Sequence, residues 1–185
     1  MLVMVDFDGT LIDTRNINYN AYKDVLSEYG YDLDYKQFCD DFNGINYKIF
    51  LRIIDSSMDP DLIETIHNKK AEIYKRYMRY GIVNESLVAM LSSLKSTGWK
   101  IVLVSAANRK NIMDAVERFS LSKLFDGMIT QEDVKSTKPN PECFLEAMKR
   151  YNEDKHTSII FEDSKTGIAA AEASGCKYYI VRGYS

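Results

Sequence analysis

The sequence of 185 residues is poor in several features that mark other classes of protein. It has only three cysteines, Cys39, Cys143 and Cys176, which are widely spaced and form no C-x-x-C pair. This spacing argues against a disulfide framework or a zinc site and favours reduced, buried thiols. The two histidines, His67 and His156, are isolated in the sequence, so neither is a good candidate for a general acid or base.

A strong net charge and a long apolar run are also missing. Lys and Arg number 24 and Asp and Glu number 27, which gives a net charge of −3 and argues against nucleic acid or a membrane surface as the main partner. No apolar stretch approaches the roughly 20 residues that span a bilayer. The first apolar run begins so early that no secretory signal fits before it, and we therefore expect a cytoplasmic protein.

The part of the chain after Gly81 alternates between apolar runs and helical patterns. Strands separated by helices of this length predict a parallel sheet with right-handed crossovers. Together with the apolar run Met1–Val5, they predict an α/β fold with a Rossmann-like core. The expected strands are 1–5, 99–105, 127–130, 158–161 and 177–181, and the expected helices between them are 87–94, 109–119, 141–151 and 166–174.

Between residues 15 and 80 the sequence shows helical patterning and no convincing strand. Nine of the 13 tyrosines lie in this segment, so we expect it to pack as a small aromatic-rich bundle. Asp59-Pro60 is a typical helix start, because Asp caps the first turn and Pro fits the first helical position. We therefore predict two domains: a core made of residues 1–14 and 81–185, and an inserted helical domain made of residues 15–80.

The motif Asp6-Phe7-Asp8-Gly9-Thr10 closes the first apolar run. Because side chains alternate along a strand, Asp6 and Asp8 point to the same side. Two carboxylates crowded in this way repel each other unless a cation or a shared proton relieves them. The end of this strand lies at the carboxyl edge of the sheet, where open α/β folds bind their ligands.

Three further segments bring polar residues to the same edge of the sheet. Ser105 and Asn108 lie at the start of a predicted helix, whose free backbone N–H groups suit an anion. Lys138 lies in a loop with two prolines, and Glu162-Asp163 ends another strand. Carboxylates from two strands make an oxygen-rich site that suits Mg²⁺. A hydroxyl, a lysine and helix-end amides beside that ion would neutralise a phosphoryl group.

The residues alone leave alternatives open at several of these positions. Ser105 could be a helix cap at the strand end instead of a phosphate ligand, and Asn108 could take that capping role. Glu162 could be a metal ligand, a partner of the ligands or a surface carboxylate. Arg15 and Lys48 are candidates to contact the distal end of an anionic substrate, and the segment around Lys48 could equally be a plain turn between helices.

The four motifs, in this order, resemble those of the haloacid dehalogenase-like hydrolase superfamily. The resemblance is strongest to the helical-capped subgroup that contains β-phosphoglucomutase and phosphoglycolate phosphatase, and it implies a cap over residues 15–80. It also implies that Asp6 is a nucleophile that forms an aspartyl-phosphate, with Asp8 as general acid and base. The implied Mg²⁺ ligands are Asp6, the backbone carbonyl of Asp8, Asp163 and, as ligand or partner, Glu162. The implied phosphate-binding residues are Thr10, Ser105, Ala106 and Lys138.

One position departs from the subgroup. Similar capped enzymes usually carry a histidine several residues after a D-[TS] pair; here the pair is Asp13-Thr14, and Asn18 stands where the histidine would be. In a mutase that histidine helps to position the acid and base residue, so Asn18 favours a phosphatase. Asn18 is also a candidate for contact with the substrate.

These observations predict an enzyme, a Mg²⁺-dependent phosphoric monoester hydrolase that acts on a small phosphorylated metabolite. A sugar-phosphate mutase and a non-catalytic binding protein on the same fold are the alternatives. Intact Asp6, Asp8, Lys138 and Asp163 argue against the non-catalytic protein, because a silent copy has no chemical reason to keep all four. We expect neither a nucleic-acid partner nor a membrane partner, and a monomer or a weak homodimer.

Overall fold

The computed structural model describes residues 1–182, and the chain divides into two compact units. The core unit consists of Met1–Asp13 and the chain from Ile82 onward. The helical unit consists of Thr14–Gly81, inserted between these two segments.

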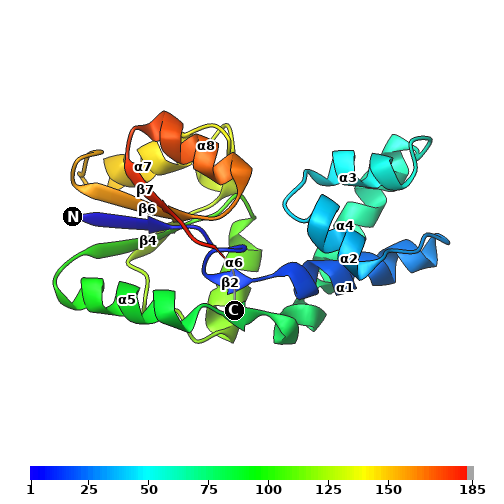
Figure 1. The fold of residues 1–185 in the computed structure, drawn as a ribbon, viewed down its shortest axis with the longest axis horizontal. Helices are drawn as coiled ribbons and strands as arrows, with labels where there is room; N and C mark the ends of the chain where they lie inside the picture. The colour runs from blue at the N-terminus through cyan, green and yellow to red at the C-terminus, as the bar shows by residue number, and fades with distance from the viewer. Residues whose placement is uncertain (183–185) are drawn as a thin grey trace. The chain divides into compact units, whose positions relative to one another are not determined.

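A five-stranded parallel sheet forms the centre of the core unit, as the alternating pattern predicts (Figure 1). Strand β1 lies in the middle, and its last residue, Val5, pairs with Leu103 on one side and Phe161 on the other. The three strands therefore end level with one another, which places the residues that follow them at one edge. In spatial order the strands are β5 (Gly127–Ile129), β4 (Lys100–Val104), β1 (Leu2–Val5), β6 (Ser158–Glu162) and β7 (Lys177–Ile180).

Helices cover the sheet because its central strands are apolar on both faces, as a parallel sheet requires. Every residue of β1 is buried. On one face, Leu2 and Met4 pack in a single cluster with Phe144 of α7 and Ala170 of α8, and Figure 1 shows α5 on the other face. The helices of this unit are α5 (Glu85–Ser96), α6 (Arg109–Arg118), α7 (Glu142–Arg150) and α8 (Lys165–Ser174).

The helical unit contains helices and no strand, as its sequence pattern predicts. Its aromatic residues form the interior: the ring centroid of Phe50 lies 4.9 Å from that of Tyr22 and 6.0 Å from that of Phe38. Asp59 caps the longest helix by accepting from the Asp61 N–H at 2.8 Å. The elements are α1 (Arg15–Glu28), α2 (Tyr35–Gln37), a π-helical turn η1 (Phe38–Phe42), α3 (Tyr47–Ile54), α4 (Pro60–Tyr77) and a 3₁₀ turn η2 (Met78–Tyr80).

Three short elements of the core unit were not expected from the sequence. Strands β2 (Ile12–Asp13) and β3 (Ile82–Val83) form a two-residue antiparallel pair where the chain leaves and re-enters the core unit. A 3₁₀ turn, η3 (Gln131–Asp133), follows β5 directly. Elements of two or three residues are too short to display a hydrophobic period, so no sequence pattern marks them.

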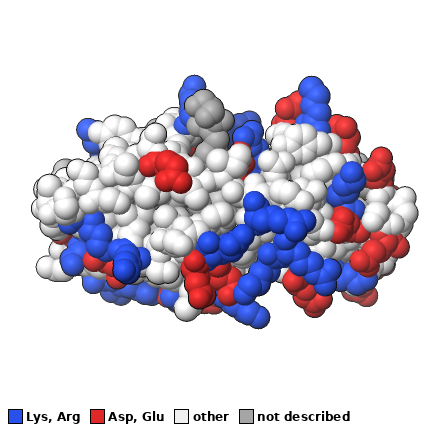
Figure 2. All heavy atoms as spheres, turned by 90° about the horizontal axis from the view of Figure 1, so that it is seen from below, with Lys and Arg blue, Asp and Glu red and all other residues white. Residues whose placement is uncertain are grey.

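The surface carries charges of both signs. On the face shown in Figure 2, Lys and Arg side chains gather in the lower centre of the view, Asp and Glu side chains lie beside them, and much of the remaining surface is uncharged. No helix within residues 1–182 combines the length and the apolar character needed to cross a membrane.

Candidate functional site

The loop after β1 folds tightly against the end of β6. Gly9 has a φ of +88°, and its N–H donates to the Ile12 carbonyl oxygen at 2.8 Å. A Cβ on Gly9 would lie 2.2 Å from the Asp163 Oδ2 atom. Only glycine combines this backbone angle with so close an approach, and the approach brings the first motif against Asp163.

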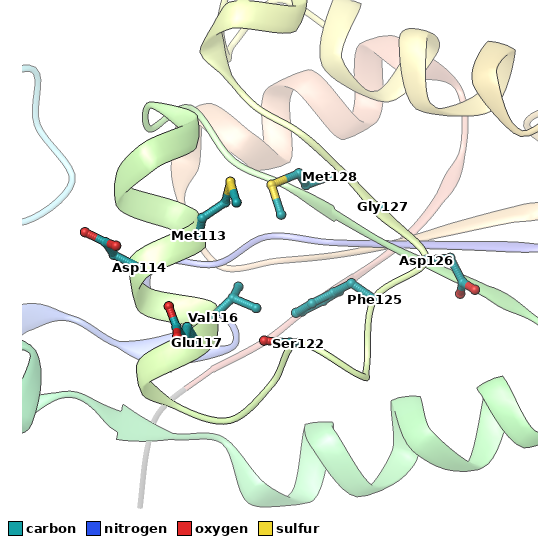
Figure 3. A pocket seen from close by; sticks show the side chains of 9 residues that line it. All are labelled: Met113, Asp114, Val116, Glu117, Ser122, Phe125, Asp126, Gly127 and Met128. Atoms are coloured by element: carbon teal, nitrogen blue, oxygen red, sulfur yellow. The ribbon is translucent and has the colours of Figure 1, made fainter.

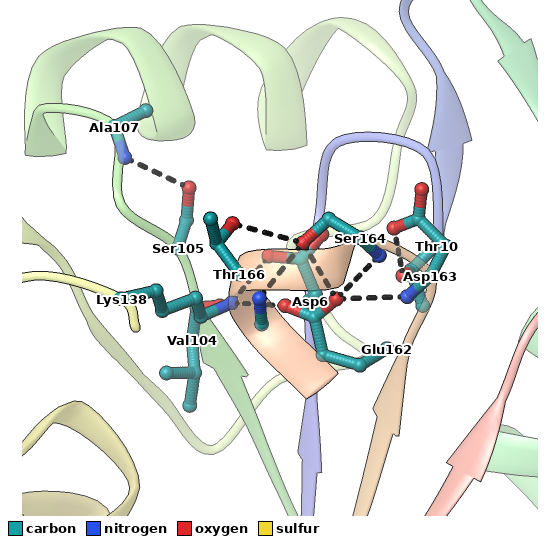
Figure 4. A network of polar contacts seen from close by, with 11 residues as sticks. Asp6, Thr10, Val104, Ser105, Ala107, Lys138, Glu162, Asp163, Ser164 and Thr166 are labelled. Carbon is teal, nitrogen blue, oxygen red and sulfur yellow. Dashed lines mark hydrogen bonds and ion pairs between the residues drawn. The ribbon is translucent and has the colours of Figure 1, made fainter. Parts of the chain in front are cut away.

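Lys138 is the charged centre of the site (Figure 4). Its Nζ atom donates to Asp6 Oδ1 at 2.6 Å, to Glu162 Oε1 at 2.7 Å and to the Val104 carbonyl oxygen at 3.0 Å. The Lys138 side chain is only 5% exposed. A buried lysine held by two carboxylates keeps its charge: burial lowers its pKa, but Asp6 and Glu162 outweigh burial, so the pKa of Lys138 lies above its usual value.

The Glu162 carboxylate is fully buried, and both of its oxygens accept hydrogen bonds. While Oε1 accepts from Lys138, Oε2 accepts from the backbone N–H groups of Asp163 at 2.8 Å and Ser164 at 2.9 Å. A Cβ on Gly167, in the first turns of α8, would lie 1.7 Å from Glu162 Oε1. Glu162 therefore connects Lys138 to the backbone that carries Asp163.

Three carboxylates converge closely enough to hold a metal ion. One oxygen each from Asp6, Glu162 and Asp163 lies within 4.8 Å of the others. Thr10 Oγ1 donates to Asp163 Oδ1 at 2.7 Å, which fixes the orientation of that carboxylate. Asp8 is partly buried in the loop that these residues share. An all-oxygen set of this kind fits a hard divalent cation such as Mg²⁺.

The crowding of carboxylates shifts their acidity. Burial raises the pKa of Asp6; Lys138 opposes this shift, while the negative charges of Glu162 and Asp163 add to it. Burial also raises the pKa of Asp163 to about 6, although its hydrogen bond from Thr10 opposes the shift. Positive charge near this cluster would therefore relieve a real repulsion.

The loop between β4 and α6 places Ser105 at the same edge of the sheet. Ser105 is 3% exposed, and its N–H donates to the Ile129 carbonyl oxygen at 2.9 Å. Its Oγ accepts from the Ala107 N–H at 3.1 Å, so the hydroxyl shapes the loop in which exposed Ala106 lies. Asn108 caps α6 by accepting from the Asn111 N–H at 2.8 Å, so its side chain takes the capping role that the sequence left open.

The start of α6 is less open to an anion than the sequence indicates. The Arg109 N–H is bonded at 3.0 Å to both carboxylate oxygens of Glu132, and the Asn111 N–H is bonded to Asn108. Two of the backbone N–H groups in the first turn are thus already engaged. An anion at this edge would meet the Ser105–Ala107 loop and Lys138 in preference to the end of the helix.

The substrate candidates Arg15, Asn18 and Lys48 belong to the helical unit, whereas the carboxylate cluster belongs to the core unit. Asn18 Oδ1 accepts from Lys70 Nζ at 2.6 Å. Lys48 Nζ pairs with Glu64 at 2.8 Å. Arg15 is partly buried in the first turn of α1. Asn18 and Lys48 are thus engaged by neighbours within their own unit.

A pocket lies elsewhere in the core unit, between α6 and the segment that leads into β5 (Figure 3). Its lining includes Met113, Phe125 and Met128, and none of the predicted site residues. The candidate site is therefore defined by its convergent polar groups and not by this pocket.

Sequence reasoning missed three residues that shape the site. Gly167 allows Glu162 to pack against α8, and an isolated glycine inside a helix is a signal of such close approach. Glu132 and Asp133 contact the start of α6, but an acidic pair after a strand is typical of a solvated turn. No local pattern distinguishes those two from ordinary surface carboxylates.

Comparison with known proteins agrees with this geometry. The family model described as haloacid dehalogenase-like hydrolase matches residues 3–181. A phosphorylated carbohydrates phosphatase from Thermotoga maritima is 28% identical over 182 residues, covering 94% of this chain and 81% of its own. A fructose-1-phosphate phosphatase from Escherichia coli is 26% identical over 184 residues, covering 97% of this chain and 95% of its own.

Solved structures show the same architecture. A protein from Thermotoga maritima, named as a candidate beta-phosphoglucomutase, superposes with a TM-score of 0.79 at 27% identity and covers 100% of this chain and 87% of its own. CbbY from Rhodobacter sphaeroides, solved in complex with phosphate, superposes with a TM-score of 0.82 at 19% identity and covers 99% of this chain and 86% of its own. The match along residues 3–181, together with the converging motifs, shows that the chain belongs to the haloacid dehalogenase-like hydrolase family.

Proposed function

We propose that this protein is a Mg²⁺-dependent phosphatase that hydrolyses a small phosphorylated metabolite through an aspartyl-phosphate. The placement of Lys138 carries the proposal: its buried Nζ atom donates to Asp6 at 2.6 Å, and the Asp163 carboxylate lies beside Asp6. The site thus places the positive charge of Lys138 and the carboxylates that could bind a cation around the carboxylate of Asp6. The relatives named as phosphatases of phosphorylated carbohydrates and of fructose 1-phosphate support the same class of substrate.

In the proposed reaction Asp6 is the nucleophile and Asp8 the general acid and base. An oxygen of Asp6 forms a bond to phosphorus while the bond from phosphorus to the ester oxygen breaks. Asp8 gives its proton to the departing oxygen and so leaves an alcohol. Asp8 then accepts a proton from water, the hydroxyl oxygen attacks phosphorus, and the bond to Asp6 breaks to release phosphate.

The oxygen atoms of Asp6, Asp163 and the Asp8 backbone carbonyl would hold Mg²⁺. When bound, the ion would neutralise charge on the transferring phosphoryl group and on the carboxylates around it. The contacts of Glu162 favour the role of partner over that of ligand, because both its oxygens already accept hydrogen bonds from Lys138 and the backbone. Lys138, Ser105, Thr10 and the Ala106 backbone would surround the phosphoryl oxygens.

The helical unit would act as a cap that excludes bulk water during the reaction. The name of the Thermotoga maritima structure refers to a mutase. Asn18 supports a phosphatase instead of a sugar-phosphate mutase. A mutase must keep its base from activating water until the sugar has recaptured the phosphoryl group. An amide that accepts from Lys70 cannot carry a proton near neutral pH as a histidine can.

A screen for phosphate release across phosphorylated metabolites, with Mg²⁺ and with chelator, tests the proposal. We expect Mg²⁺-dependent release from at least one small monoester, with free phosphate as the main product. Full activity in chelator would contradict the metal assignment. Sustained conversion of β-glucose 1-phosphate with a bisphosphate primer into glucose 6-phosphate, followed by phosphorus NMR, would favour the mutase instead.

A further inference from the structure

The 3₁₀ turn η3 makes three contacts with the chain that surrounds the start of α6. The Gln131 N–H donates to the Ala107 carbonyl oxygen at 3.2 Å, inside the loop between β4 and α6. The two oxygens of Glu132 each accept from the Arg109 N–H at 3.0 Å. The Asp133 carboxylate pairs with the Arg109 guanidinium at 2.5 Å. The turn η3 therefore contacts the backbone of Ala107 and both the backbone and the side chain of Arg109, where the loop between β4 and α6 ends.

Asp133 also fixes η3 itself and ties it to α7. Its Oδ2 atom accepts from the Thr130 N–H at 2.8 Å and from the Thr130 hydroxyl at 2.9 Å. Its other oxygen pairs with Arg150, at the end of α7, at 3.0 Å. Asp133 therefore connects the end of β5, the start of α6 and the end of α7 through a single carboxylate.

These contacts matter because the loop that they hold is the one that would meet phosphate. Ser105 is anchored to β5 through its N–H, and the loop returns to Ser105 through the Ala107 N–H. At the other end, η3 contacts the carbonyl of Ala107 and the N–H of Arg109. Groups that bind a transferring phosphoryl group must be held to within about half an ångström of their working position. Removing the second anchor would let that end of the loop shift.

An ordinary structural role is the competing explanation, and it makes a different prediction. The Arg109 and Arg150 side chains are 39% and 40% exposed, so solvent screens their pairs with Asp133. Exposed pairs of this kind contribute little to stability. If η3 served stability alone, its loss would lower the melting temperature slightly and leave phosphate affinity unchanged.

We propose that Glu132 and Asp133 are positioning residues that hold the Ser105–Asn108 loop for phosphoryl binding, an assignment that rests on the proposed phosphatase function. They act through the backbone of Ala107 and Arg109 and do not touch the substrate. Glu132 sets the direction of the Arg109 N–H, and Asp133 holds the turn from which Glu132 reaches it.

The test compares three variants with the unmodified protein. Glu132→Ala removes the acceptor for the Arg109 N–H, Glu132→Gln keeps an acceptor oxygen without the charge, and Glu117→Ala removes an exposed carboxylate near the other end of α6 as the matched control. The readouts are the dissociation constant of inorganic phosphate by calorimetry with Mg²⁺ present, kcat and KM for the substrate found in the screen, and the melting temperature.

We expect Glu132→Ala to raise the phosphate dissociation constant and KM by about tenfold, with a smaller effect on kcat. Glu132→Gln should restore most of the affinity, and Glu117→Ala should match the unmodified protein. Unchanged phosphate affinity in Glu132→Ala would overturn the proposal, and so would a Glu132→Gln variant as impaired as Glu132→Ala. If Glu132→Ala does not fold, Asp133→Ala replaces it, because it removes the acceptor that holds the turn at Thr130, and unchanged affinity there has the same meaning.

Calorimetry separates this proposal from the proposed function, because phosphate binding needs no turnover. A protein that binds phosphate but hydrolyses no ester would contradict the phosphatase, and the variants would still decide the role of η3. A protein that binds no phosphate would overturn the role of η3 directly.

Discussion

The polar groups of the core unit and of the helical unit are used in opposite ways. In the core unit, charged side chains from segments far apart in sequence converge, so that Lys138 contacts both Asp6 and Glu162 out of water. In the helical unit, the pair Lys48–Glu64 lies at the surface, with side chains 58% and 45% exposed. Burying the charges of Lys138, Asp6 and Glu162 costs desolvation energy, which their mutual attraction offsets. Solvent screens the exposed pair Lys48–Glu64, so its attraction is weak.

Acidity shows the same contrast. Burial raises the pKa of Asp163 to about 6. Hydrogen bonds from Lys48 and Tyr47 lower the pKa of Glu64 instead. The core unit thus keeps its carboxylates under a repulsion that a cation would relieve, whereas Glu64 in the helical unit already has a cationic partner. Chemistry is therefore expected to depend steeply on core residues and weakly on single charges of the helical unit.

The largest expected effect is that of Asp6→Asn. The amide keeps the shape of the side chain and an acceptor for Lys138, but it loses the nucleophilic oxygen, so kcat/KM should fall by at least about 10³-fold. The measurement is phosphate release with Mg²⁺ on the preferred substrate. The same exchange at Asp61, exposed in the helical unit, should leave turnover unchanged. Near-normal turnover in Asp6→Asn would rule out the covalent mechanism.

The second prediction concerns Gly167→Ala in α8, which we expect to destabilise the protein. Gly→Ala inside a helix normally stabilises a protein by about 1 kcal/mol, but Gly167→Ala would place a Cβ 1.7 Å from Glu162 Oε1. We expect a loss of about 2 kcal/mol of unfolding free energy in urea, and a loss of turnover of about tenfold or more, because Glu162 holds Lys138. Thr166→Ala, at the exposed neighbouring position, is the control. A stabilised Gly167→Ala protein would show that Glu162 moves aside freely.

The third effect is a dependence of metal binding on pH. With a pKa of about 6, Asp163 is mostly protonated at pH 5 and mostly ionised at pH 7. The Mg²⁺ concentration that gives half-maximal activity should therefore be about tenfold higher at pH 5 than at pH 7. Because the pKa is raised on folding, Asp163 contributes most to stability below its unfolded pKa near 4, and this contribution is lost as pH rises through 6. An activation constant independent of pH would contradict the assignment of Asp163 as a ligand.

The smallest effect is expected from Lys48→Ala in the helical unit. Breaking an exposed pair should change the free energy of unfolding by less than about 1 kcal/mol. We expect kcat to stay unchanged and KM to rise no more than about threefold, if Lys48 meets the distal end of the substrate. A large fall in kcat would show that the two units share the chemistry, and the contrast drawn between them would fail.

Much of the fold was predictable because its strands and helices are long enough to show a hydrophobic pattern in the local sequence. The apolar runs that became β1, β4 and β6 fix the order of the motifs, and parallel strands bring the residues that follow them to one edge. The convergence of Asp6, Glu162 and Asp163 could thus be predicted from position alone, whereas Lys138 lies in a loop nine residues after the end of β5. The roles assigned to these residues stay predictions until activity is measured.

Other features depend on contacts between distant residues and left no local mark. The short pair β2–β3 has too few positions to show alternation. The two oxygens of Glu162 are divided between Lys138 and the backbone, a detail that only three-dimensional packing decides. Glu132 and Asp133 resemble any solvated acidic turn, and their link to Arg109 spans more than twenty residues of sequence.

The pair β2–β3 has a consequence for how the chain could be rearranged. Ile12 lies opposite Val83 and Asp13 opposite Ile82, so the points where the chain leaves the core unit and returns to it are neighbouring residues of one antiparallel ladder. Such a ladder can be closed by a two-residue hairpin turn. An Asn-Gly turn in place of Thr14–Gly81 should therefore give a shortened protein whose parallel sheet still unfolds cooperatively, as far-UV circular dichroism during heating would show. The helical unit would then be a replaceable module, and exchanging it between relatives would be a route to new substrates.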